Sequence, residues 1–190
     1  MQRVKRKASK QEVLSLLDPL IAEWFDSRFD GLTEPQSYAI PLIHERKSVL
    51  VSSPTGSGKT LTAFTSIINE LFKYAKDGKL EDRIYAVYVS PLKALANDIN
   101  KNLEEPLAQM HELAKQKGYE FPKVRVGVRS GDTSQSERQK QLRKPPHIFI
   151  TTPESLALVL AAPKFREKFS QVEYVIVDEI HEICDSKRGV

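Results

Sequence analysis

The sequence contains a single cysteine, no long apolar run and no internal repeat. One cysteine, Cys184, cannot form an internal disulfide, which excludes a disulfide-stapled secreted fold and fits a reducing cytoplasm. No stretch approaches the roughly 18 consecutive apolar residues of a membrane span. The segment after the basic start carries Glu12, Asp18 and Glu23, which argues against a signal peptide. We therefore expect a cytoplasmic protein with no membrane partner.

The sequence also lacks a general excess of positive charge. Its net charge of +4 comes from the first ten residues, which hold five basic residues and no acidic one: Arg3, Lys5, Arg6, Lys7 and Lys10. The remainder has 24 basic and 25 acidic residues, so its net charge is −1. The start is either a solvated tail or an arm for nucleic-acid phosphates. A polyanion bound by the remainder must be held by local contacts.

Short apolar runs alternate with amphipathic stretches along the chain. The runs predict strands at 49–51, 84–89, 124–128, 147–150 and 174–177, and the stretches 61–75, 92–113 and 154–160 predict helices, the second broken at Pro106. Ser9 and Glu12 predict a capped helix from about residue 10, with a restart at Asp18-Pro19. Strand–helix alternation indicates an α/β fold with a parallel sheet and helices on both faces. We expect a tail and leading helix over 1–24 and one domain over 25–190.

A phosphate-binding loop is the strongest motif. It follows the first apolar run and opens an amphipathic helix, and it consists of Ser53, Pro54, Thr55, Gly56, Ser57, Gly58, Lys59 and Thr60. Glycines let successive backbone N–H groups turn toward phosphate oxygens at a helix N-terminus. Lys59 would reach the β- and γ-phosphates of ATP, and the Thr60 hydroxyl would hold Mg²⁺. The first position of the pattern is Ser53 in place of glycine.

An acidic pair follows the last predicted strand. Asp178 and Glu179 come directly after the run Tyr174–Val177. Beside a phosphate loop, Asp178 is suited to hold Mg²⁺ through its water shell, and Glu179 to orient and polarise an attacking water. His181 either couples nucleotide state to a partner domain or is merely hydrogen-bonded.

These motifs resemble those of superfamily 2 helicases. Residues 53–60 resemble helicase motif I, 178–181 resemble motif II in its DEIH form, and 32–36 with 39–41 resemble the adenine-reading Gln motif. Further segments resemble motif Ia and motif Ib at 90–95 and 151–156, and a strand-contacting loop at 130–133 and 136–138. The whole set is most similar to the large helicase-related (Lhr) family, in its first RecA-like domain.

The resemblance assigns further binding residues. Gln36 would read the edge of adenine, although Thr33 and Gln36 also fit a capping box in which Gln36 serves its own helix. Phe29 could pack against the base or belong to the core. The candidates for nucleic-acid phosphates are Lys93, Arg129, Gly131, Asp132, Thr152 and Ser155. Without the resemblance, Lys93 could also be an ordinary solvated lysine that binds no phosphate.

The implied activity is that of an ATP-dependent helicase. The resemblance implies 3′ to 5′ movement on single-stranded DNA, in repair or recombination, and a second RecA-like domain that closes on ATP. Nothing in the sequence resembles motifs III to VI, so we expect a piece of a longer motor that is inactive alone. The missing motif III strand would lie between the strands that carry the two nucleotide motifs. The alternatives are an RNA helicase and an ATP-gated clamp that does not translocate, although Glu179 argues against a clamp.

Overall fold

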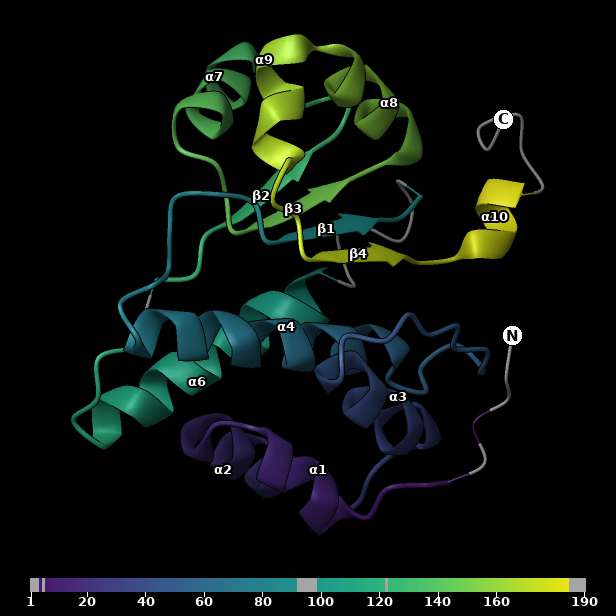
Figure 1. The fold of residues 1–190 in the computed structure, drawn as a ribbon, viewed down its shortest axis with the longest axis vertical. Helices are drawn as coiled ribbons and strands as arrows, with labels where there is room; N and C mark the ends of the chain where they lie inside the picture. Colours follow the sequence, from purple (N-terminus) through teal and green to yellow (C-terminus); the bar gives the residue numbers. More distant parts are fainter. Residues whose placement is uncertain (1–3, 5, 92–98, 122, 185–190) are drawn as a thin grey trace. The chain divides into compact units, whose positions relative to one another are not determined.

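The computed structural model describes residue 4 and residues 6–91, 99–121 and 123–184. They fall into two compact units (Figure 1). The first unit consists of Met1–Lys79 with Asn100–Pro122, and the second of Leu80–Ile99 with Lys123–Val190.

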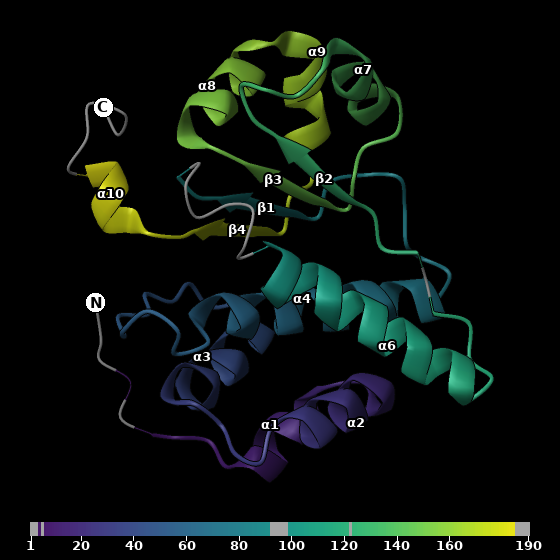
Figure 2. The ribbon, with the colours of Figure 1, turned by 180° about the vertical axis from the view of Figure 1, so that it is seen from behind.

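The first unit is helical. Its elements are α1 (Lys10–Leu16), α2 (Pro19–Arg28), α3 (Glu34–His44), α4 (Lys59–Lys76), the short π-helix η1 (Asn100–Glu104) and α6 (Glu105–Gln116). Helix α3 packs against α4, and α2 packs against α6 (Figure 2). The core of this unit includes side chains that are at most 1% exposed, among them Val13, Ile21, Phe25, Phe64, Ile68, Leu71, Leu103 and Met110. Burial of this apolar surface is the main force that holds the helices together.

The predicted helix starts in this unit are confirmed. Ser9 and Glu12 form a reciprocal capping box at the start of α1. Asp18 caps α2, where its Oδ1 accepts a hydrogen bond from the Leu20 N–H at 3.1 Å. Pro106 lies in the first turn of α6, where its missing N–H would have no helical partner, and η1 ends directly before that helix.

The second unit is built on a four-stranded parallel sheet. Its strands are β1 (Ala86–Val89), β2 (Val126–Arg129), β3 (Ile148–Thr151) and β4 (Tyr174–Val177), in the order β2-β3-β1-β4. The predicted α/β class with a parallel sheet is therefore confirmed. Because the strands are parallel, their carboxyl ends share one edge of the sheet, where functional loops of such folds gather.

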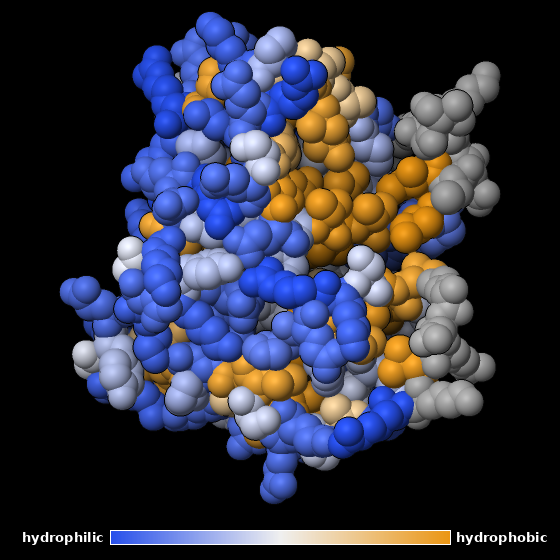
Figure 3. Space-filling model, in the orientation of Figure 1, coloured by the Kyte–Doolittle hydropathy of each residue, from blue (hydrophilic) through white to orange (hydrophobic). Residues whose placement is uncertain are grey.

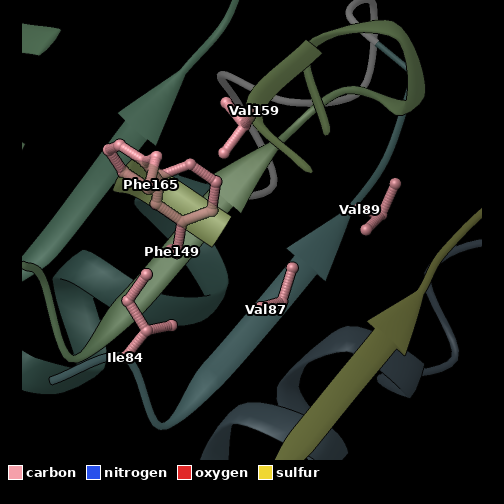
Figure 4. Close-up of a cluster of buried hydrophobic side chains, with 6 residues drawn as sticks. All are labelled: Ile84, Val87, Val89, Phe149, Val159 and Phe165. Carbon is pink, nitrogen blue, oxygen red and sulfur yellow. The ribbon is translucent and has the colours of Figure 1, made fainter. Parts of the chain in front are cut away.

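Helices of the second unit cover one face of this sheet. They are α7 (Gln135–Arg143), α8 (Pro153–Ala161) and α9 (Pro163–Arg166), followed by a 3₁₀ turn, η2 (Glu167–Phe169); α10 (Ile180–Cys184) follows β4. Figure 4 shows the core between strands and helices, which consists of Ile84, Val87, Val89, Phe149, Val159 and Phe165. The ring of Phe149 contacts Phe165 with centroids 5.6 Å apart, which fixes α9 over β3.

One predicted strand is absent from the structure, and one predicted helix is only partly described. The run Val49–Val51 is not a strand, and Leu50 is 59% exposed. A strand requires hydrogen bonds to a neighbour, and none of the four described strands pairs with this run. Most of the first part of the predicted helix at 92–113 lies outside the described residues.

Apolar surface gathers on the second unit (Figure 3). It includes Leu158 and Leu160 of α8, Val175 and Val177 of β4, and Ile180 of α10. Strand β4 ends the order of the described sheet, and the exposed fractions of Val175 and Val177 are 65% and 43%. Within the described part of the chain, no helix combines the length and apolarity needed to cross a bilayer.

Candidate functional site

Two glycines shape the loop that precedes α4. Gly56 has φ of 80° and Gly58 has φ of 86°, both in the left-handed region that other residues avoid. The Ser57 N–H donates to the Pro54 carbonyl at 3.3 Å, which closes a tight turn. Residues with a Cβ at both glycine positions would strain the loop, so its curled shape follows from the sequence.

The N-terminus of α4 is open to an anion. Gly58 is its N-cap and makes no side-chain hydrogen bond to the first turn, which contains no acidic residue. By contrast, α1, α3, α7 and α8 are each capped by a serine or threonine hydroxyl. The 18 residues of α4 give a full helix dipole, so its first N–H groups can bind phosphate oxygens.

The predicted phosphate ligands lie around this helix start. The Lys59 Nζ donates to the carbonyls of Ser53 and Pro54 at 2.7 and 3.0 Å. The Ser53 and Ser57 hydroxyls are 2.7 Å apart, so Ser53 closes the loop with a side chain that glycine could not supply. Thr60 is the second residue of α4, and Thr55 and Gly56 are exposed at the tip of the loop. The Lys59 ammonium is thus held by two backbone carbonyls, and its contact with phosphate oxygens stays a prediction.

Gln36 lies in a capping box. Its side-chain Oε1 accepts from the Thr33 N–H at 2.8 Å, its own N–H donates to the Thr33 hydroxyl, and it is 1% exposed. A Cβ added to Gly58 would lie 3.7 Å from the Gln36 Nε2, so this amide borders the phosphate loop. The structure thus realises the capping role, while adenine reading stays a prediction. Phe29 is half-buried and packs on Phe25 and Trp24, and a contact with the base stays a prediction.

In the second unit, Asp178 is fixed at the carboxyl end of β4. Its N–H donates to the Val89 carbonyl at 2.9 Å, which extends the β1–β4 ladder by one bond. Its Oδ2 accepts a hydrogen bond from the Tyr88 hydroxyl at 2.8 Å, and its Oδ1 accepts from the Glu179 N–H at 2.9 Å. The carboxylate orientation is therefore set by donors from two directions.

Glu179 occupies an unusual backbone conformation. Its φ of 50° is in the left-handed region, which costs a residue with a Cβ about 1–2 kcal/mol. Its carbonyl accepts from the Glu182 N–H at 2.9 Å, which starts the turn into α10. Its Oε2 lies 3.4 Å from the His181 Nδ1, and the His181 side chain is 70% exposed. His181 therefore contacts the acid next to Asp178, and a role in domain coupling stays a prediction.

Among the described residues, no three histidine, cysteine, aspartate or glutamate side chains are grouped to hold a metal ion. Mg²⁺ is usually held by one or two carboxylates together with water and substrate phosphates. A single oriented carboxylate followed by a second acid fits a metal that arrives with a nucleotide.

The last residue of β2 and the loop after it carry three of the predicted strand contacts, Arg129, Gly131 and Asp132. The Arg129 guanidinium lies 4.9 Å from the centre of the Phe165 ring. Burial, together with the nearby charge of Arg138, lowers the pKa of Arg129 below its usual value. Gly131 and Asp132 are exposed in a turn held by Arg138, which donates to the Thr133 and Gly131 carbonyls at 2.8 and 3.0 Å. Two arginines thus border this turn.

Thr152 and Ser155 lie at the start of α8. The Thr152 hydroxyl accepts from the Ser155 N–H at 3.3 Å, and the two residues are 5% and 7% exposed. In this conformation their side chains serve the helix cap, so a contact with nucleic acid requires a rearrangement or the use of nearby backbone. Lys93 lies outside the described residues.

The comparisons with known proteins decide the family. The sequence pattern of the DEAD/DEAH box helicase family matches residues 33–190. The chain belongs to this family. It is 56% identical over 190 residues to the ATP-dependent helicase Lhr-Core of Methanothermobacter thermautotrophicus, and 53% identical over 190 residues to that of Methanocaldococcus jannaschii. Each match covers 100% of this chain and 22% of the relative. The predicted resemblance to Lhr helicases is confirmed, and the chain spans about a fifth of these relatives.

Solved helicase structures share the fold. The Mycobacterium smegmatis helicase Lhr bound to ssDNA and AMP-PNP matches with a TM-score of 0.82 and 42% identity, over 93% of this chain and 22% of that one. The DEAD-box helicase Mss116 bound to ssRNA and UDP-BeF matches with a TM-score of 0.76 and 24% identity, over 96% of this chain and 35% of that one. At 24% identity, the match to Mss116 supports the RecA-like fold and nothing more.

Sequence reasoning missed the hydrogen bonds of two residues in this DEAD/DEAH box chain. Tyr88 is completely buried in β1 and donates to Asp178, and Arg138 holds the turn at Gly131. The signal for Tyr88 was a hydroxyl inside an otherwise apolar strand, where a buried polar group needs a partner. Arg138 lies in the segment 136–138 that resembles a strand-contacting loop, but its bonds to the turn were not predicted, because a charged residue on a polar helix is normally solvated.

Proposed function

We propose that this chain is the ATP-binding lobe of an ATP-dependent nucleic-acid motor. The observation that carries the proposal is the uncapped N-terminus of α4 behind a loop with two left-handed glycines. That arrangement supplies backbone donors and a helix dipole to a triphosphate. Membership of the DEAD/DEAH box family supports ATP as the nucleotide.

The proposed roles follow from the chemistry of each residue. Ser53, Thr55, Gly56, Ser57 and Gly58 wrap the phosphates, and Lys59 moves from the loop carbonyls to the β- and γ-phosphates. Thr60 and Asp178 would hold Mg²⁺, which neutralises charge on the phosphate oxygens when it is bound. Glu179 would polarise the attacking water, and Gln36 would contact adenine.

Single-stranded DNA is the proposed track. The Lhr structure at 42% identity is bound to ssDNA, whereas the relative bound to ssRNA has 24% identity. We propose that the second unit contacts the backbone with Lys93, Arg129, the Gly131-Asp132 turn, Thr152 and Ser155. We propose that a second RecA-like lobe completes the motor, and the 22% share of the matched relatives that this chain spans leaves room for one. An ATP-gated clamp is less favoured, since such a protein has no need of Glu179.

The phosphate loop can be tested on the 190-residue chain. Lys59→Ala removes a charged donor to the phosphates, so the Kd for a fluorescent ATP analogue should rise about 10- to 100-fold. Equilibrium titration monitored by fluorescence anisotropy measures this change. Lys79→Ala, at an exposed lysine paired with Asp77, is the matched control and should bind as the wild type does. Equal affinity of the wild type and Lys59→Ala would refute the phosphate loop assignment.

A further inference from the structure

Tyr88 occupies a position in β1 that brings its hydroxyl to the acidic motif. It is 0% exposed and faces Ile176 of β4 in the ladder, two residues before Asp178. Its hydroxyl donates to the Asp178 Oδ2 at 2.8 Å. A buried phenol without a partner would lose the hydrogen bond that it makes in water. The tyrosine and the carboxylate therefore hold each other in place.

A second hydrogen bond orients the Asp178 carboxylate. The Glu179 N–H donates to the other oxygen, Oδ1, at 2.9 Å. A carboxylate oxygen has about two lone-pair directions, so a donor to each of the two oxygens fixes the plane of the group. The Tyr88 hydroxyl and the Glu179 N–H are both neutral donors, so these two hydrogen bonds orient the carboxylate without adding a positive charge beside it.

We infer that Tyr88 is a positioning residue for the proposed metal ligand Asp178. The inference rests on the proposed function, in which Asp178 holds Mg²⁺ beside a bound nucleotide. Hydrogen bonds to a ligating carboxylate set its direction, and their loss typically lowers metal affinity by about 10- to 100-fold. Tyr88 acts through Asp178, so its effect is on Mg²⁺ binding and not on nucleotide binding without metal.

Tyr85, three residues before Tyr88, offers a matched control substitution. Tyr85 is 1% exposed, and its hydroxyl accepts a hydrogen bond from the Glu81 N–H at 2.9 Å. Tyr85→Phe and Tyr88→Phe therefore each remove one buried phenolic oxygen from the same stretch. Only the second removes a donor to Asp178. A general loss of stability would affect both variants alike.

The experiment measures how Mg²⁺ changes nucleotide affinity. A fluorescent ATP analogue is titrated against the 190-residue chain with EDTA and with increasing Mg²⁺. Tyr88→Phe should raise the half-saturating Mg²⁺ concentration about tenfold or more and leave the Kd in EDTA unchanged. Excess Mg²⁺ should restore wild-type affinity, and Tyr85→Phe should match the wild type throughout. Incorporation of 4-aminophenylalanine at position 88, which keeps the ring and a donor, should restore the Mg²⁺ response.

The outcomes separate the inference from the proposed function. If neither the wild type nor Asp178→Asn responds to Mg²⁺, the role of Asp178 itself is wrong. If Asp178→Asn loses a response that Tyr88→Phe retains in full, Tyr88 does not position the carboxylate. If Tyr88→Phe proves unfolded by circular dichroism, the 4-aminophenylalanine variant decides alone, and a wild-type Mg²⁺ response supports the inference while a lost response overturns it.

Discussion

Polar residues next to the strands are either partly accessible to a ligand or buried as part of the fold. At the carboxyl ends, Asp178 and Glu179 are oriented but remain partly accessible, which suits groups that meet a ligand. At the start of β3, His147 is 1% exposed, and its Nδ1 accepts from the Arg125 N–H at 3.2 Å. Burial, followed by the positive charge of Arg125, lowers the pKa of His147 from 6.5 to about 4. This histidine is structural, because the fold holds it in its neutral form.

Acid should therefore destabilise the chain through His147. The unfolded chain takes up this proton near pH 6.5 and the folded chain only near pH 4. The unfolded state thus binds more protons between these values, so stability falls as the pH is lowered through this window. The unfolding temperature should drop by a few degrees between pH 7 and pH 4.

The measurement is thermal unfolding followed by circular dichroism across that pH range. His147→Asn keeps a side-chain acceptor for the Arg125 N–H but cannot take up a proton, so its unfolding temperature should depend less steeply on pH. An identical pH dependence in this variant and the wild type would show that His147 is not the responsible group.

Elements differ in how far their sequences determine them. The capping boxes at Ser9 and Thr33 could be predicted from the sequence, because each depends on two side chains that are only three residues apart. Strands β1, β3 and β4 lie within two residues of the predicted runs. The run at Val49 failed because pairing depends on a neighbour that local sequence does not specify. The bond from Tyr88 to Asp178 joins residues 90 positions apart, so only the β1–β4 pairing reveals it.

The start of α3 can separate the two roles of Gln36. Thr33→Ala removes the capping hydroxyl and should lower the free energy of unfolding by about 1 kcal/mol, while the Gln36 amide remains able to contact adenine. Gln36→Ala should lower stability and also weaken the preference for ATP over GTP, because the amide is lost. Urea denaturation and competitive nucleotide titration measure the two effects. If Gln36→Ala keeps the full preference for ATP, Gln36 serves only as a helix cap.

At the scale of the whole molecule, charge and length limit what the chain does by itself. Residues 11–190 carry a net charge of −1, so a strand must be held by local contacts instead of a general positive field. Hydrolysis of ATP develops charge on the γ-phosphate, which an arginine can stabilise, and the proposed function takes such arginines from a second lobe. The 190 residues correspond to 22% of the matched Lhr-Core helicases.

We therefore predict that the 190-residue chain binds ATP but shows no increase in turnover when single-stranded DNA is added. A coupled ATPase assay with and without an oligothymidine strand measures this. The same assay on a longer polypeptide that adds the second lobe should show stimulation, and Lys59→Ala in that polypeptide should abolish turnover while strand binding persists. Because Lys59 and the proposed strand contacts lie in different units of the fold, their separate loss is expected. Steady strand-stimulated hydrolysis by the 190 residues alone would mean that one lobe supplies every group needed for the transition state.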